Sequence, residues 1–175
     1  MSRPRLTGGR ARGRSLAHAV REGVRPTSSR VREALFSIVG QDLQGARILD
    51  AFGGTGLLGL EAWSRGAAVV VVERDPRTAR EISANAEALG ATVEVRIGDV
   101  LAVAPELGRF DGILVDPPYR DLPGPIVERL ASSVDDWLVL EAEERTEAPI
   151  VGSLEREPRR SYGGTALWVY RRAAG

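Results

Sequence analysis

The feature that most restricts the fold of this chain is a glycine-rich turn between a strand-like run and a helix-like run. Residues 46–52 form an apolar run of strand length, and residues 53–56 follow it directly. Gly54, Gly56 and Gly59 match the spacing G-x-G-x-x-G, which is weak evidence alone and stronger between a strand and a helix. Glycine lets the backbone approach a ligand, and a helix start offers free N–H groups. We therefore predict a nucleotide-binding turn; the alternative is a glycine turn that binds no ligand.

Apolar strand-like runs alternate with helical patterns along most of the chain. Asp75-Pro76 offers an N-cap and a first-turn proline to one of these helices, and Gly90 closes it. The alternation stops near the C-terminus, where residues 155–161 and 165–171 are typical of the two strands of a hairpin. The five strands predicted before that hairpin are residues 46–52, 67–73, 92–97, 110–115 and 136–141. We predict one α/β domain with a doubly wound, mostly parallel sheet and a C-terminal antiparallel hairpin.

Two acidic residues follow predicted strands at the edge where parallel sheets bind their ligands. Glu73 ends the second strand, 19 residues after Gly54. That spacing is typical of a carboxylate that accepts hydrogen bonds from both ribose hydroxyls of a nucleotide. Asp99 follows the third strand, where it could accept from an adenine amino group or cap the next helix. Both interpretations of Asp99 stay open at this point.

The segment Asp116-Pro117-Pro118-Tyr119 follows the fourth predicted strand. Two prolines cannot donate to a β-ladder, so the strand must end there in a rigid, extended segment. A carboxylate and a proline carbonyl could accept both hydrogens of an exocyclic amino group on a base, while the tyrosine ring stacks on that base. The alternative is an ordinary strand-to-loop turn with a surface aromatic residue. We interpret the segment as a candidate catalytic centre for amine chemistry.

The residues that the chain lacks exclude several chemistries. It contains no cysteine, no lysine and one histidine, His18, so disulfides, thiolate sites and cysteine nucleophiles are excluded and no metal centre is expected. A nicotinamide-dependent oxidoreductase would need a second domain and usually a histidine or lysine for proton transfer. A methyltransferase needs alignment more than acid–base catalysis. A non-catalytic RNA-binding domain would leave the glycine turn and Glu73 unexplained, so the methyltransferase is favoured.

The zero net charge hides a strongly basic N-terminal segment. Residues 1–32 hold nine arginines and one acid, a net charge of +8, and the remaining 143 residues carry −8. A basic segment on an acidic body suggests an anionic polymer as the partner. Arg10, Arg12 and Arg14 alternate, so an extended backbone would place their guanidinium groups on one face, where they could contact phosphates. A disordered basic tail is the alternative.

A helix is predicted where this basic segment ends. Thr27 to Ser29 offer N-caps, and Gly40 ends the run. The apolar residues repeat at helical spacing, which predicts a buried face of Val31, Leu35 and Ile38 and an outer face of Arg30, Arg32 and Glu33.

Several segments together resemble the RsmD family of 16S rRNA guanine-N2 methyltransferases over nearly the whole chain. They are Gly8-Gly9-Arg10, Arg12-Gly13-Arg14, Arg25-Pro26-Thr27, Arg30-Val31-Arg32-Glu33-Ala34-Leu35-Phe36, Asp50-Ala51-Phe52-Gly53-Gly54-Thr55-Gly56, Leu58-Gly59-Leu60-Glu61-Ala62 and Asp116-Pro117-Pro118-Tyr119. The resemblance implies a Rossmann-like class I methyltransferase fold that uses S-adenosyl-L-methionine to methylate the N2 amine of one guanine in small-subunit ribosomal RNA. The last motif is shared with adenine-N6 and cytosine-N4 enzymes acting on RNA or DNA, which remain alternatives, and an oxidoreductase is a more remote one.

The resemblance also implies roles for particular residues. The implied cofactor-binding residues are Asp50, Phe52, Gly53, Gly54, Gly56, Glu73, Arg74, Asp99 and Val100, and the catalytic residues are Asp116, Pro117, Pro118 and Tyr119. The RNA-binding residues are Arg10, Arg12, Arg14, Arg25, Thr27, Arg30 and Arg32. One departure is Gly53-Gly54, where the family more often has alanine-glycine.

We expect residues 1–24 to form a basic RNA-contacting arm and residues 25–175 the methyltransferase domain. No run of about 20 apolar residues and no signal-peptide pattern is present, so we expect a cytoplasmic protein without a membrane segment. The expected partner is small-subunit ribosomal RNA, within an assembling or assembled subunit, and the enzyme is expected to act as a monomer without a metal.

Overall fold

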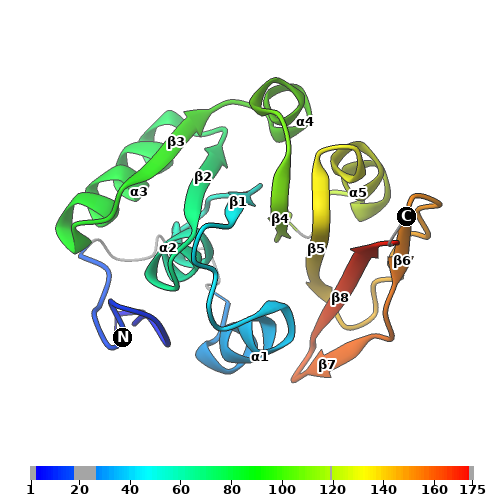
Figure 1. The fold of residues 1–175 in the computed structure, drawn as a ribbon, viewed down its shortest axis with the longest axis horizontal. Helices are drawn as coiled ribbons and strands as arrows, with labels where there is room; N and C mark the ends of the chain where they lie inside the picture. Colours follow the sequence, from blue (N-terminus) through cyan, green and yellow to red (C-terminus); the bar gives the residue numbers. More distant parts are fainter. Residues whose placement is uncertain (1–2, 18–26, 119, 174–175) are drawn as a thin grey trace.

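The computed structural model describes residues 3–17, 27–118 and 120–173, and Figure 1 shows them as one mixed sheet with helices on both faces. The helices are α1 (Ser29–Val39), α2 (Leu57–Ser64), α3 (Pro76–Leu89), α4 (Val100–Val103), the 3-10 helix η1 (Ala104–Leu107) and α5 (Pro123–Ala131). The strands are β1 (Arg47–Asp50), β2 (Ala68–Glu73), β3 (Val93–Ile97), β4 (Phe110–Val115), β5 (Val134–Glu143), β6 (Leu154–Arg156), β7 (Arg160–Tyr162) and β8 (Thr165–Arg172).

The strand order is β3-β2-β1-β4-β5-β8-β6, with β7 also paired to β8. The five strands from β3 to β5 are parallel, and β8 is antiparallel to β5, β6 and β7. The chain first builds the sheet outward from β1 through β2 to β3, and then returns to the other side of β1 with β4 and β5. This is the doubly wound, mostly parallel sheet that the sequence predicts.

The predicted C-terminal hairpin is only partly right. Residues 155–161, expected as one strand, are divided between β6 and β7, which pair with different parts of β8. Pro158 lies in the gap between the two strands and has no N–H to donate, so a continuous ladder is interrupted there. Gly163 and Gly164 join β7 to β8, so an antiparallel hairpin is present as predicted, with a shorter first strand.

Local signals define the helices well. The Ser28 side chain caps α1 by accepting a hydrogen bond from the Val31 N–H. The Asp75 side chain caps α3, Pro76 is its first residue, and Gly90 ends it in the left-handed conformation. These four positions confirm the boundaries expected from the sequence.

The core consists of two apolar clusters on opposite faces of the sheet. Ile48 packs on the face that α1, α2 and α3 cover, whereas its neighbour Leu49 packs on the face covered by α4 and α5. Val71 and Val72 of the adjacent strand divide in the same way, because side chains alternate along a strand. The central strands are therefore buried on both sides, as expected for a parallel sheet.

The N-terminal segment, residues 3–17, packs on the face of the sheet that α1, α2 and α3 cover. It does not form an extended strand. Leu6, Ala11 and Leu16 are buried in the core cluster beneath α1, α2 and α3. Residues 8–13 form turns, with Gly9 and Gly13 in the left-handed region, so the prediction that Arg10, Arg12 and Arg14 share one face of a strand is wrong. The apolar residues between the arginines are the reason, since their burial curls the segment onto α2.

Glu61 of α2 is the polar anchor of this packing. It is fully buried and forms ion pairs with Arg65 and with Arg32 of α1, the latter at 3.3 Å. It also accepts hydrogen bonds from the Thr7 N–H, the Thr7 hydroxyl and the Gly8 N–H. The N-terminal segment, α1 and α2 therefore meet at one carboxylate.

The prediction that Arg32 lies on the outer face of α1 is wrong. Its side chain is only 3% exposed, and besides the Glu61 ion pair its guanidinium donates to the carbonyls of Thr27 and Arg5. Phe36 is buried beside it, and Ile38 is only partly buried. A helix pattern that counts only apolar residues cannot detect a buried cation whose partner lies on another helix.

None of the helices in the part of the chain that the structure describes is both long and apolar enough to cross a membrane.

Replacing Glu61 by glutamine should lower the free energy of unfolding by about 3–5 kcal/mol, because Arg32 and Arg65 would become uncompensated buried charges. Urea denaturation measures this change. The matched control is Glu94→Gln, which removes a surface ion pair with Arg96 and should cost no more than about 1 kcal/mol. Equal losses in the two variants would contradict the anchoring role of Glu61.

Candidate active site

The residues predicted to bind ligands gather at the carboxyl ends of the parallel strands. The strand order reverses between β1 and β4, and open α/β sheets bind ligands in the crevice at that point. Asp50 ends β1, Glu73 ends β2, and Asp116 follows β4. Sequence positions up to 66 residues apart are therefore brought to one edge of the sheet.

The glycine turn is held by the predicted ribose-binding acid. One carboxylate oxygen of Glu73 accepts from the Gly54 N–H, and the other accepts from the Asp75 N–H, both at 2.9 Å. Gly54 and Gly56 have φ angles of 54° and 75°, which side-chain-bearing residues rarely adopt. Gly56 also lies against Ile82 of α3, where an added Cβ would be 2.9 Å from the isoleucine Cγ2. Glu73 thus fixes the turn and retains acceptor capacity for a ligand, since each carboxylate oxygen has two lone pairs.

Asp50 is a buried carboxylate with one uncommitted oxygen. Its side chain is 1% exposed, and Oδ2 accepts from the Gly59 N–H at 2.9 Å. Oδ1 is buried without a hydrogen-bond partner among the described residues. Burial is the main cause that raises the pKa of Asp50 well above its usual value. An unpartnered buried acceptor beside the glycine turn is suited to a donor group on a ligand.

The remaining residues predicted to bind the cofactor differ in which atoms they leave available to a ligand. Asp99 caps α4, because its Oδ1 accepts from the Leu101 N–H at 2.8 Å, so the capping interpretation of this residue is right and Oδ2 is left to contact a ligand. The Val100 side chain is in the apolar core, which leaves its backbone for binding. Phe52 is partly buried, and Arg74 is exposed.

The proline segment begins as the sequence predicts, directly after β4. Asp116 is half-buried, and burial raises the pKa of its carboxyl to about 6. The Pro118 carbonyl accepts from the Asp121 N–H at 2.8 Å, so the turn already uses one of the two proline carbonyls. Among the described residues, no backbone N–H donates to the Pro117 carbonyl next to Asp116. Tyr119 lies outside the described residues, and its stacking role stays a prediction.

A second acid, which the sequence analysis missed, lies beside Asp116. Glu141 near the end of β5 is 8% exposed and accepts a hydrogen bond from the Thr27 hydroxyl at 2.9 Å. The same hydroxyl lies 3.5 Å from Asp116 Oδ2. Glu141 ends the apolar run of its strand, as Glu73 does, and that signal could have identified it. Thr27 is buried against the two acids, and its predicted role in RNA binding stays a prediction.

The predicted RNA-binding arginines have different environments. Arg10 stacks on Trp63 and donates to its carbonyl, while Arg14 donates to the carbonyls of Ala88 and Leu89 at the end of α3. Arg12 has no such partner within residues 3–17, 27–118 and 120–173. Arg30 is exposed on α1, and Arg25 lies outside the described residues.

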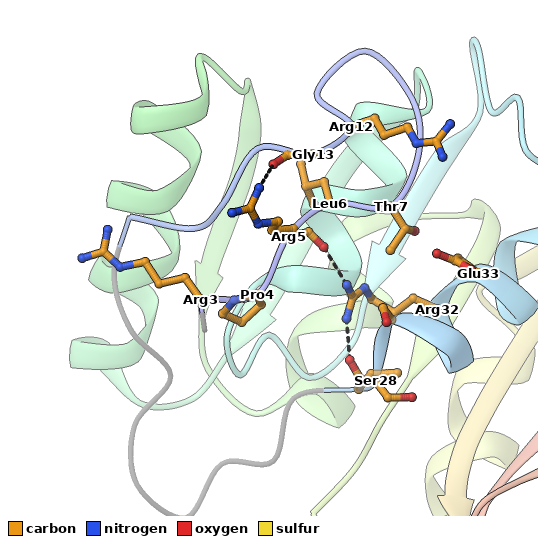
Figure 2. Close-up of a pocket in the computed structure, with 12 residues that line it drawn as sticks. Arg3, Pro4, Arg5, Leu6, Thr7, Arg12, Gly13, Ser28, Arg32 and Glu33 are labelled. Atoms are coloured by element: carbon orange, nitrogen blue, oxygen red, sulfur yellow. Dashed lines mark hydrogen bonds between the residues drawn. The ribbon is translucent and has the colours of Figure 1, made fainter. Parts of the chain in front are cut away.

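A surface hollow of about 520 Å³ separates the N-terminal segment from the start of α1. Figure 2 shows the Arg32 guanidinium bridging the two walls below this hollow, and Arg3 and Arg12 at its opposite ends. Thr27, which contacts Asp116 and Glu141, also lines the hollow. Thr27 therefore lies between the hollow and the two acids at the sheet edge.

The fold and this edge are those of a Rossmann-like class I methyltransferase. The chain belongs to the RsmD family: the family model described as "Conserved hypothetical protein 95" matches residues 4–171. The chain is 34% identical to ribosomal RNA small subunit methyltransferase D of Escherichia coli, over 88% of this chain and 79% of that protein. The solved structure of yhhF from Escherichia coli superposes with a TM-score of 0.86 at 31% identity, over 99% of this chain and 100% of that one.

A more distant neighbour shares the fold alone. It is an RNA methyltransferase from Salinibacter ruber, solved in complex with S-adenosyl-L-homocysteine, with a TM-score of 0.69 at 17% identity. The match covers 85% of this chain and 94% of that one.

Replacing Gly56 by alanine should destabilise the protein more than the same change at Gly90. Both glycines have left-handed φ angles, 75° and 68°, but a Cβ at Gly90 meets nothing within 4 Å, whereas one at Gly56 crowds Ile82. Backbone strain should cost about 1–2 kcal/mol at either site, and the crowding should add about 1–3 kcal/mol at Gly56. Urea denaturation measures both losses, and equal losses would contradict close packing of the turn against α3.

Proposed function

We propose that this protein transfers a methyl group from S-adenosyl-L-methionine to the exocyclic N2 amine of one guanine in 16S ribosomal RNA. The observation that carries the proposal is the half-buried Asp116 carboxylate beside the Pro117 carbonyl, at the sheet edge that also holds the glycine turn. Membership of the RsmD family supports it, since a relative in that family is named as a small-subunit rRNA methyltransferase.

The residues around the glycine turn fit S-adenosyl-L-methionine. The free buried oxygen of Asp50 is suited to accept from the ammonium group of the methionine part, and Glu73 is suited to accept from the ribose hydroxyls. Asp99 has one carboxylate oxygen left for the adenine amino group. When bound, this cofactor supplies an electrophilic methyl group on a sulfonium. Three acids at the edge also favour the positive charge of that sulfonium.

Asp116 and Pro117 provide what an aromatic amine requires before it can act as a nucleophile. Two acceptors that bind both amine hydrogens draw the nitrogen lone pair out of conjugation with the ring. As the nitrogen gains positive charge, the Asp116 carboxylate stabilises it and accepts the proton that it must lose. Asp116 therefore acts mainly in the transition state, and alignment of the amine supplies the rest.

The basic segment supplies the RNA-binding side of the proposal. Arg12 and Arg30 are exposed, and Arg12 lines the hollow together with Arg3. Arg10 and Arg14 are also exposed, but their guanidinium groups donate to backbone carbonyls. Exposed arginines commonly contact the phosphates of a nucleic acid. The target base must leave its stack to reach Asp116, which costs a few kcal/mol and is easiest in an RNA loop.

The function is tested with purified protein, methyl-labelled S-adenosyl-L-methionine and small ribosomal subunits or 16S rRNA from a strain that lacks the protein. Mass spectrometry of the digested nucleosides should find N2-methylguanosine at one position. Asp116→Asn should retain cofactor and RNA binding but lose about 10²–10³-fold in single-turnover rate, as when one preorganised polar group is removed. Label in N6-methyladenosine or N4-methylcytidine would replace the guanine assignment. Absence of transfer together with tight NADH binding would overturn the methyltransferase proposal.

Arg12 and Arg14 should differ in their effect on RNA binding. Replacing Arg12 by alanine should lower the slope of log affinity against log salt for a 16S rRNA transcript by roughly 0.7–0.9, because one phosphate contact is lost. Arg14→Ala is the matched control, since Arg14 is bound to the carbonyls that end α3 and should change the slope less. Filter binding at several salt concentrations measures both. An unchanged slope in Arg12→Ala would remove this residue from the proposed interface.

A further inference from the structure

Two acids beside the proposed catalytic centre share a single hydroxyl group. Thr27 Oγ1 lies 2.9 Å from Glu141 Oε2 and 3.5 Å from Asp116 Oδ2. A threonine hydroxyl has only one hydrogen, so it cannot donate to both carboxylates at once. The pairing Val115–Leu140 places Asp116 and Glu141 side by side at the ends of two neighbouring strands. With both acids ionised, one of them would receive no hydrogen from Thr27, whereas a proton on one acid lets both form a hydrogen bond with this hydroxyl.

The charges around the pair favour one retained proton. Burial, followed by the charge of Asp116, raises the pKa of Glu141 to about 8, while the Thr27 hydrogen bond and the Arg32 charge oppose the rise. Arg32 is itself held by Glu61, which limits its effect on Glu141. On the other side, Asp116 faces the buried acid Asp50. Between about pH 6 and pH 8, the pair therefore holds one proton.

We infer that Glu141 is a positioning residue that keeps this proton and, through the Thr27 hydroxyl, holds Asp116 as the ionised acceptor. In this arrangement the protonated Glu141 donates to Thr27 Oγ1, and the Thr27 hydrogen turns to Asp116 Oδ2. The carboxylate oxygens of Asp116 then keep lone pairs for the amine, and no second negative charge competes for its hydrogens. This inference rests on the proposed function of Asp116.

The arrangement also explains why two acids can occupy one buried edge. Two negative charges on acids that share one hydroxyl would repel each other in a medium of low dielectric constant. A neutral Glu141 removes that repulsion and becomes a donor, which an ionised carboxylate cannot be. The Thr27 hydroxyl thus links Glu141 of β5 to Asp116, which follows β4.

The test is the single-turnover methyl-transfer rate of the full-length protein on 16S rRNA as a function of pH. The wild type should lose rate below about pH 6, where Asp116 is protonated, and above about pH 8, where Glu141 loses its proton. Glu141→Leu should lower the rate at pH 7 about tenfold. Glu141→Gln keeps a donor that does not titrate, so it should recover most of that rate and lose the decline above pH 8. The matched control is Glu143→Gln, which changes an exposed acid two residues further along β5. This variant should lose rate below pH 6 and above pH 8 just as the wild type does.

Two threonine variants test the hydroxyl itself. Thr27→Ser keeps the hydroxyl and should retain the wild-type pH profile, whereas Thr27→Val keeps the shape and should lose about tenfold at pH 7. Carboxyl ¹³C NMR provides a readout that does not depend on activity: the wild type should show coupled titrations near pH 6 and pH 8. In Glu141→Gln, the titration near pH 8 should be absent and the Asp116 titration near pH 6 should remain, since the amide replaces a carboxyl that is already neutral at that pH.

The outcomes separate this inference from the proposed function. A decline above pH 8 that persists in Glu141→Gln, or equal rates for Thr27→Val and Thr27→Ser, would overturn the positioning role while leaving methyl transfer intact. A wild type that transfers no methyl group would overturn the proposed function, and the NMR titration would still decide whether Glu141 holds the proton.

Discussion

The buried carboxylate of Glu61 is the interaction on which the arrangement of the functional face depends. It is fully buried in α2 and joins Arg65, Arg32 and the backbone of the N-terminal segment. A buried charge is costly unless it is paired and hydrogen-bonded, and here two guanidinium groups and three donors from the N-terminal segment satisfy it. Because its donors come from three segments, the group stabilises one relative placement of those segments.

Arg32 connects these three segments to the edge of the sheet. The guanidinium bound by Glu61 also donates to the Thr27 carbonyl, and the Thr27 hydroxyl contacts Asp116 and Glu141. The basic segment, the start of α1 and the end of β4 are thus linked by consecutive polar contacts. The segment that the proposed function assigns to RNA is in this way connected to the candidate active site through Arg32 and Thr27.

The sheet itself separates the charges of the chain. Parallel strands bring Asp50, Glu73, Asp116 and Glu141 to one edge, while the exposed arginines of the N-terminal segment lie at the neighbouring hollow. Acidic groups at the edge suit a cationic methyl donor, and basic groups beside it suit a phosphate backbone. A single short chain therefore presents opposite charges to its two proposed ligands.

The sequence by itself determined the features that depend on neighbouring residues. The glycine turn, the Asp75-Pro76 cap and the strand that stops at Asp116 could all be predicted, because backbone restrictions of glycine and proline act locally. Only the tertiary structure decided that Arg32 is buried and that Thr27 touches Glu141. Their partners lie 29 and 114 residues away, and a buried cation or a shared proton leaves no periodic pattern in a sequence. The sequence therefore predicted the candidate site, and long-range contacts determined how its acids are held.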